Sequence, residues 1–163
     1  MGKANESTCR VVTFTPTVDT AIYASGDQLG SLVEIPNFVD EPSGFTKIVS
    51  LSVHDKAAQS SIMQVLFFRD RPTVTSVDNA ALNISDAEMA DKCIGHVSIV
   101  AGDYFALSAS SMGCVRNVQL VVTSRKGQLN LTGRSVWAII RCGGTPTYAS
   151  TTDLVFTVGL ENN

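Results

Sequence analysis

The sequence predicts an all-β protein, an antiparallel β-sandwich for which a jelly roll is the first choice of topology. Two observations carry this prediction. Apolar side chains occupy every second position of several segments, as at Leu154, Phe156, Val158 and Leu160, and this is the period of a half-buried strand. Glycine and proline turns separate such segments at short intervals, as they do in all-β sandwiches and barrels.

Segments with strand character follow one another along the chain. Pro16 stops the first and Pro36 closes the second, because proline cannot donate to a sheet ladder. Residues 61–68 are apolar on both faces, which predicts a central strand. Near the end of the chain, an irregularity is expected around Gly133. The expected strands cover residues 10–14, 28–35, 49–53, 61–68, 94–99, 104–109, 115–123, 129–142 and 153–160.

One short helical turn is expected near residues 85–92. Ser85 and Glu88 have the spacing of a capping box, in which the Ser85 hydroxyl accepts from the Glu88 amide and the Glu88 carboxylate reaches back to the Ser85 amide. Strand character resumes at Ile94, so the helix extends by only about one further turn.

A single β-sandwich domain is expected over residues 9–163, preceded by a flexible arm at residues 1–8, which are small and polar. A chain of 163 residues can bury a core without a disulfide or a metal. Hydrophobic residues make up 44% of the chain and charged residues only 17%, so few charges cover its surface. We therefore expect a partner to cover part of the apolar surface.

Charge and hydropathy argue against two classes of partner. The net charge of −3 offers no basic excess to displace counterions from nucleic acid. The first residues lack the apolar core of a signal peptide, and no apolar run approaches the length that spans a bilayer. We expect a soluble protein, synthesised in the cytoplasm, that binds neither nucleic acid nor membrane.

The sequence predicts no catalytic, cofactor or metal site, and we expect that the protein is not an enzyme. His54 and Asp55 are adjacent, but neighbouring strand residues point to opposite faces and cannot form the orienting pair of a triad. Neither phosphate-binding glycine motif occurs, and the scattered cysteines favour free thiols over zinc. Four carboxylates near the helical turn lack the spacing of a calcium loop: Asp78, Asp86, Glu88 and Asp91.

Charged and polar side chains near the strand ends and in the arm are the candidate protein contacts. Charges at strand ends normally discourage edge pairing, and they can also contact a partner. The candidates are Arg69, Arg71, Arg125 and Lys126 at strand ends, together with Lys3, Asn5 and Glu6 in the arm.

Four stretches resemble a family of small structural proteins of tailed bacteriophages, some of which decorate or cement the capsid. The resemblance extends over most of residues 10–160. It implies a β-sandwich that assembles as an oligomer, often a trimer, on the outer surface of the head, and it transfers no catalytic residue. The four stretches are residues 19–30, DTAIYASGDQLG; 66–73, LFFRDRPT; 78–85, DNAALNIS; and 144–154, GTPTYASTTDL.

The expected function is therefore that of a virion structural protein, a capsid decoration or cement protein that stabilises the phage head. Its expected partners are the major capsid protein and further copies of itself in a homotrimer. One alternative is a tail or fibre component of the virion. Another is a carbohydrate-binding jelly-roll module, against which stands the single Trp137, which lies in an expected strand rather than in a loop.

Overall fold

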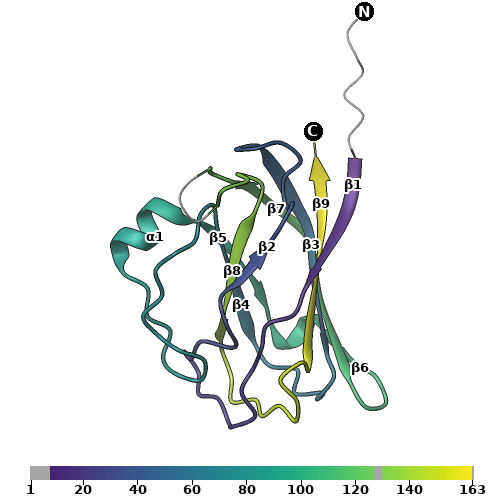
Figure 1. Ribbon diagram of the computed structural model, residues 1–163. Coiled ribbons are helices and arrows are strands. Elements are labelled where there is room, and N and C mark those ends of the chain that lie inside the picture. Colours follow the sequence, from purple (N-terminus) through teal and green to yellow (C-terminus); the bar gives the residue numbers. More distant parts are fainter. Residues whose placement is uncertain (1–7, 127–129, 163) are drawn as a thin grey trace, which may run out of the picture.

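The computed structural model describes residues 8–126 and 130–162 and contains two antiparallel sheets packed face to face (Figure 1). The first sheet has the strand order β1-β9-β3-β7-β6, and the second has the order β2-β8-β4-β5. The elements are β1 (Thr8–Phe14), β2 (Val33–Ile35), β3 (Phe45–Asp55), β4 (Met63–Phe68), α1 (Asp86–Lys92), β5 (Cys93–Ile99), the 3-10 turn η1 (Ala101–Asp103), β6 (Tyr104–Ala106), β7 (Ser111–Thr123), β8 (Val136–Cys142) and β9 (Leu154–Asn162).

The strand order confirms the jelly roll. The chain folds back on itself so that β1 pairs with β9, β2 with β8, β3 with β7 and β4 with β5. The first four strands alternate between the two sheets, and β7, β8 and β9 alternate on the way back. Without β6, which is an addition at the edge beyond β7, each sheet has four strands, as in a jelly roll of eight.

The main core lies between the sheets, where alternate residues of each strand meet. Along β9, buried and half-exposed positions alternate from Leu154 to Asn162, as the sequence predicts. Phe156 stacks on Phe14 of the neighbouring β1 with ring centroids 5.0 Å apart. Leu51 of β3 and Val65 of β4 are fully buried in the same cluster. Each such side chain contributes about 1.5–3 kcal/mol on burial.

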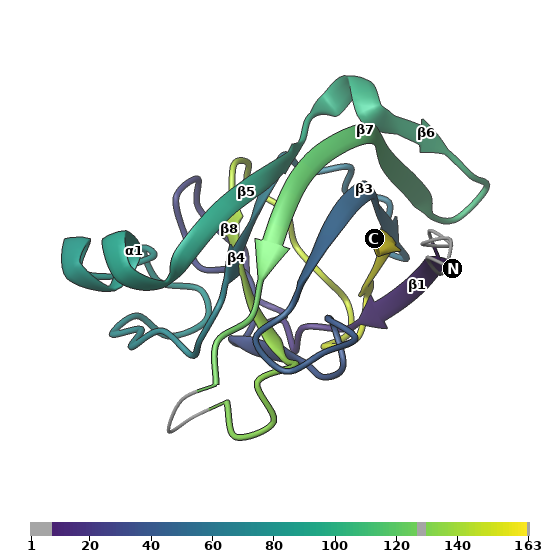
Figure 2. The same cartoon turned by 90° about the horizontal axis from the view of Figure 1, so that it is seen from above.

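A second, smaller apolar cluster involves the second sheet. Phe68, Trp137 and Ile139 form its buried part, and Met89 of α1 packs against them. Phe67, next to Phe68, belongs instead to the main core, so β4 is buried on both faces, as expected of a central strand. Viewed from above, α1 lies beside the second sheet, away from β1 and β9 (Figure 2).

Several expected element boundaries are wrong. Only Val33–Ile35 of the expected strand 28–35 is strand, although Gln28 makes an isolated bridge to Arg141. Of the expected strand 129–142 only Val136–Cys142 forms, because the chain turns at Gly133, whose φ is +63°. Strands β3 and β7 extend beyond the expected 49–53 and 115–123, whereas β6 is shorter than the expected 104–109.

The expected helix forms, but half of its capping box does not. The Ser85 hydroxyl accepts from the Glu88 amide at 3.3 Å, as predicted. The Glu88 carboxylate turns instead to the Thr73 amide at 2.8 Å and to the Lys92 ammonium at 2.8 Å. These two partners lower the pKa of Glu88. The carboxylate therefore ties the helix to the loop after β4.

Candidate contact surface

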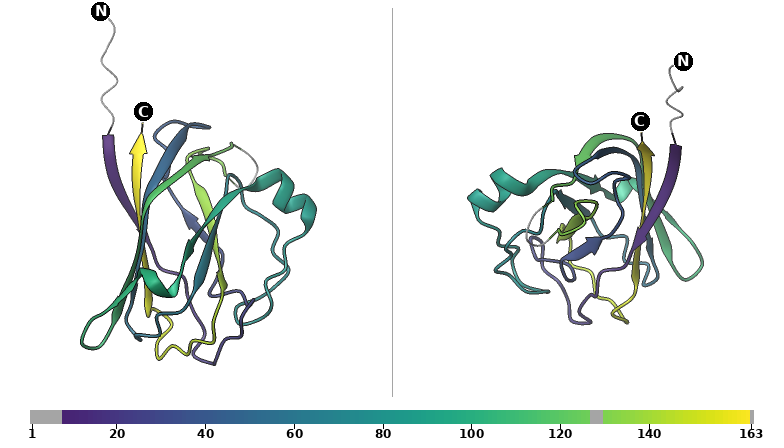
Figure 3. Two further views of the ribbon diagram at one scale, coloured as in Figure 1. Left: turned by 180° about the vertical axis from the view of Figure 1, so that it is seen from behind. Right: turned by 45° about the horizontal axis from the view of Figure 1, so that its top comes forward.

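The β6–β7 hairpin extends beyond the body of the sandwich (Figures 1 and 3). Among the described strands β6 pairs only with β7, so its other edge is open. The hairpin turn is closed by the amide of Leu107, which donates to the Ser110 carbonyl at 2.8 Å. Residues 104–115 contain no charged side chain. This edge therefore has none of the charges that usually protect an exposed strand from pairing.

Tyr104 and Gly113 anchor the hairpin to the sandwich. They are direct cross-strand partners, and a Cβ on Gly113 would lie 2.9 Å from the Tyr104 ring, so glycine makes room for that ring. The Tyr104 hydroxyl donates to the Ser61 carbonyl at 2.7 Å. Burial raises the pKa of Tyr104, so its hydroxyl remains a donor at neutral pH. The base of the hairpin is thus rigidly placed.

The hairpin exposes large apolar side chains. Phe105 is 51% and Leu107 44% exposed. Phe105 is the register partner of Met112, which in turn faces His54 of β3, so these three side chains share the outer face of the first sheet. That outer face also carries Val11 at the β1 edge, 64% exposed.

Charge on this outer face is sparse. Lys47 and Glu161 neutralise each other in an ion pair of 2.9 Å. Arg116 is exposed, and no carboxylate pairs with it in the part of the chain that the structure describes. The outer face is thus the surface of the first sheet that points away from the second sheet. Its apolar side chains are Val11, Phe45, Phe105, Leu107, Met112 and Val121.

Arg125, one of the predicted contact residues, is held within the molecule. Its guanidinium binds both carboxylate oxygens of Asp91, at 3.1 and 2.9 Å, and lies 3.7 Å from Asp70. The hydrogen bonds between Arg125 and Asp91 lower the pKa of Asp91 and raise that of Arg125. Arg125 therefore joins the chain after β7 to helix α1.

The other predicted contact residues have different environments. Arg69 is half-buried, and its carbonyl accepts from the Arg125 amide at 3.0 Å. The Arg71 guanidinium lies over the Trp137 ring, 5.4 Å from its centroid. Lys126 is exposed, with its amide donating to Ser43 Oγ at 3.3 Å. The structure thus brings Arg69, Arg71 and Arg125 together near α1, while the arm candidates Lys3, Asn5 and Glu6 lie outside the described residues.

Sequence reasoning missed Phe105 and Leu107. The available signal was the uncharged run at residues 104–115, within which a strand was already expected. Whether such a strand lies at a sheet edge depends on pairing with distant segments, and a local pattern does not contain that information.

His54 and Asp55, the adjacent pair considered for a catalytic triad, each have a hydrogen-bond partner elsewhere in the fold. Asp55 points into the core, where its carboxylate accepts from the amides of Ala57 at 3.0 Å and Ser60 at 2.8 Å. Its burial raises its pKa. On the opposite face, His54 Nε2 lies 3.2 Å from Ser110 Oγ, so His54 and Asp55 are not paired, as expected from their adjacency.

Neither a metal-binding cluster nor a membrane-spanning helix occurs in the described ranges 8–126 and 130–162. No three His, Cys, Asp or Glu side chains gather there in a group able to hold a metal ion. No helix in those ranges is long and apolar enough to span a membrane. The four cysteines are free thiols, and Cys142 is buried.

Comparisons with known proteins find no matching family model and no matching curated protein. Two solved viral structures show low similarity. One is from the heated full particle of Israeli acute paralysis virus, with 11% identity and a TM-score of 0.30 over 96% of this chain and 67% of that chain. The other is Desmodium yellow mottle tymovirus, with 9% identity and a TM-score of 0.28 over 99% of this chain and 84% of that chain. Because these TM-scores are low, neither structure is used to assign a function to this chain. The assignment of the jelly roll is based on the strand order.

Proposed function

We propose that this chain is a non-catalytic structural protein of a virus particle, a decoration or cement protein bound to the outer surface of a tailed-phage head. One observation carries the proposal: the first sheet ends in a rigid, uncharged hairpin that exposes Phe105 and Leu107. An open apolar edge of this kind is a template for another chain unless a partner covers it. The resemblance of residues 10–160 to small phage structural proteins supports the same role.

A cement protein acts by adding interface to an assembled shell. Anything that binds the assembled state, and not its separated subunits, shifts the equilibrium towards assembly by mass action. The jelly roll suits this task because its rigid sheets present the outer face with little conformational entropy to lose on binding. The proposed partners are the major capsid protein and further copies of this chain, with closed symmetry in the assembly.

The test uses the full chain and capsids assembled without it. Phe105→Lys places a charge on the exposed hairpin without touching the core, and we expect it to weaken co-sedimentation with capsids at least about tenfold, as expected for an apolar anchor of an interface. Ile22→Lys is the matched control, since Ile22 is 66% exposed but lies in the loop before β2. Its binding should equal that of the unmodified chain.

Two results would overturn the proposal. One is equal capsid binding by the Phe105→Lys variant and the unmodified chain, which would remove the hairpin from the interface. The other is antibody labelling of the tail or fibres, instead of the head, in negatively stained virions. Circular dichroism of both variants verifies that the sandwich is intact.

A further inference from the structure

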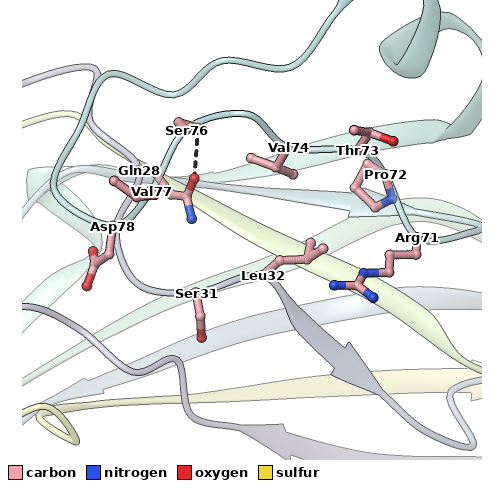
Figure 4. Close-up of a pocket in the computed structure, with 10 residues that line it drawn as sticks. All are labelled: Gln28, Ser31, Leu32, Arg71, Pro72, Thr73, Val74, Ser76, Val77 and Asp78. Atoms are coloured by element: carbon pink, nitrogen blue, oxygen red, sulfur yellow. Dashed lines mark hydrogen bonds between the residues drawn. The ribbon is translucent and has the colours of Figure 1, made fainter.

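The pocket beside the second sheet has its charged groups at opposite ends. It lies between the segment that leads into β2 and the loop that follows β4, with a volume of about 470 Å³ (Figure 4). Arg71 and Asp78 stand at its two ends, and Ser31 and Leu32 lie between them (Figure 4). These polar groups do not converge on one ligand. The first sheet, by contrast, has backbone groups that face one direction along an open edge.

That edge is β6, whose backbone has unpaired groups. In an antiparallel pair, residues that bond to the partner strand alternate with residues whose N–H and C=O point away from it. The Leu107 amide bonds to the Ser110 carbonyl across the hairpin. Counting back from Leu107, the backbone of Phe105 faces β7 and that of Ala106 faces outwards. Tyr104 also faces outwards, and its N–H bonds to the 3-10 turn η1. The Tyr104 C=O and both backbone groups of Ala106 therefore point to where no described strand pairs with them.

The opposite edge of the same sheet is β1, which pairs only with β9 among the described strands. The one charged residue of β1 is Arg10. Its guanidinium forms an ion pair of 3.1 Å with Asp40 and donates to the Phe38 carbonyl. Strand β6 contains no charged residue. Both edges therefore lack the unpaired charges that keep exposed strands from pairing with another chain.

The two edges run in the same direction. Four antiparallel pairs lead from one edge to the other: β1 with β9, β9 with β3, β3 with β7 and β7 with β6. Four reversals leave β1 and β6 parallel. Rotation of a copy about an axis along the strands therefore brings its β1 beside β6 of its neighbour as a parallel pair. One such contact gives both open edges a partner.

We propose that β6 of one copy and β1 of the next copy pair through their backbones, so that the first sheet continues from copy to copy. The inference rests on the proposed function only in naming a second copy of this chain as a partner. Ala106 contributes its N–H and C=O, and Phe105 lies beside the outer-face side chains of β1, such as Val11. Because Tyr104 anchors β6 to the Ser61 carbonyl, the strand loses little freedom on pairing.

Amide hydrogen exchange of the full chain in solution separates backbone pairing from contact between side chains alone. The Ala106 amide faces away from β7, so it gains a strand partner only when β1 of another copy binds. We expect it to exchange at least about tenfold more slowly in the trimer than after dilution to the monomer. Amides of β1 should be slowed over the same concentration range. The Leu107 amide is the internal control, because it bonds to Ser110 in either state.

A proline variant tests the same hydrogen bond. Ala106→Pro removes the outward N–H and leaves the bonds to β7, which come from Phe105 and Leu107. Proline is tolerated at an edge position whose N–H faces outwards. We expect association between copies to weaken at least about tenfold, measured by analytical ultracentrifugation. Slow exchange of the Leu107 amide verifies that the hairpin has formed in the variant.

The matched control is Ala87→Pro. Ala87 is also exposed, and it lies in the first turn of α1, where backbone N–H groups have no partner within the helix and proline fits. Helix α1 lies beside the second sheet, away from β1 (Figure 2). This variant should associate like the unmodified chain.

The inference fails on any of three results. The first is unchanged association by an Ala106→Pro variant whose hairpin has formed. The second is equal exchange of the Ala106 amide at high and low protein concentration. The third is slowed exchange in β6 without slowed exchange in β1, which would mean that two β6 edges pair with each other. None of these measurements uses capsids, so a failure here leaves the proposed binding to the head to its own test.

Discussion

At the scale of single residues, Gly113 determines how closely the protruding hairpin can approach the sandwich. A Cβ at this position would meet Ile99 Cγ2 and the Tyr104 ring, both at 2.9 Å. Real Cβ atoms do not approach other atoms so closely, so an added methyl group must displace the ring or the strand. The same ring carries the hydroxyl that binds the Ser61 carbonyl, so a displaced ring also loses that hydrogen bond.

We predict that Gly113→Ala lowers the free energy of unfolding by about 1–3 kcal/mol, the usual cost of overpacking a filled site. Urea denaturation measures the change. Gly102→Ala is the control, because a Cβ there meets nothing within 4 Å, and its stability should stay within about 0.5 kcal/mol of the unmodified chain. Equal stability of both variants would mean that Tyr104 does not pack over Gly113.

At the scale of elements, the connection between β4 and β5 forms a layer against the second sheet, held by ion pairs. Arg125 and Asp91 join its helix to the chain after β7. Asp91 has a lowered pKa in the folded protein, with the Arg125 hydrogen bond as the main cause. A carboxylic acid whose pKa is lower in the folded protein than in the unfolded chain stabilises the fold at pH values above the pKa of the unfolded chain. This stabilisation is lost as the pH falls through the pKa of the folded protein.

We therefore predict that Arg125→Gln is less stable than the unmodified chain at pH 7, and that the difference shrinks as the pH falls below about 4. Added salt should also reduce the difference, because both side chains are exposed and their attraction is screened. Thermal unfolding across pH and salt concentration measures it. Arg116→Gln should show no such dependence, and a difference between Arg125→Gln and the unmodified chain that persists at pH 2 would assign Arg125 another role.

The same elements show which features the sequence could predict. Alternation at Leu154, Phe156 and Val158 predicts β9 correctly, because a period of two depends only on which face is buried. Glu88 was expected to return to Ser85, but it bonds to Thr73, which lies fifteen residues earlier in the chain. Local signals therefore identify most strands and the helix, whereas the partners of charged side chains depend on the tertiary fold.

The candidate contact surface was predictable only in part, for the same reason. Arg125 stood out in the sequence as an exposed charge, but Asp91 neutralises it from a helix 34 positions away. Phe105 did not stand out, because an apolar residue in an expected strand is normally buried. It is exposed because β6 is the last strand of its sheet, and the strand order that places it there follows from the whole jelly roll.

At the scale of the whole molecule, the first sheet has two edges, β1 and β6. Both expose apolar side chains, Val11 at one edge and Phe105 at the other, and no charge lies in residues 104–115. A contact between the β1 edge of one copy and the β6 edge of the next copy is head-to-tail. A series of such contacts closes into a ring when the rotation from each copy to the next adds up to a full turn. This arrangement accommodates the homotrimer that the sequence predicts.

We predict a trimer in solution, three chains of 17.3 kDa giving a mass of about 52 kDa by light scattering. Because association stabilises the folded chain by mass action, the melting temperature should rise with protein concentration. Phe105→Lys should lower both the mass and this concentration dependence, since the lysine would place an unpaired charge in the contact between neighbouring edges. Ile22→Lys should change neither. A monomer that melts at the same temperature at every concentration would contradict the predicted trimer, and a trimer that persists in the Phe105→Lys variant would place the contact between copies at another edge.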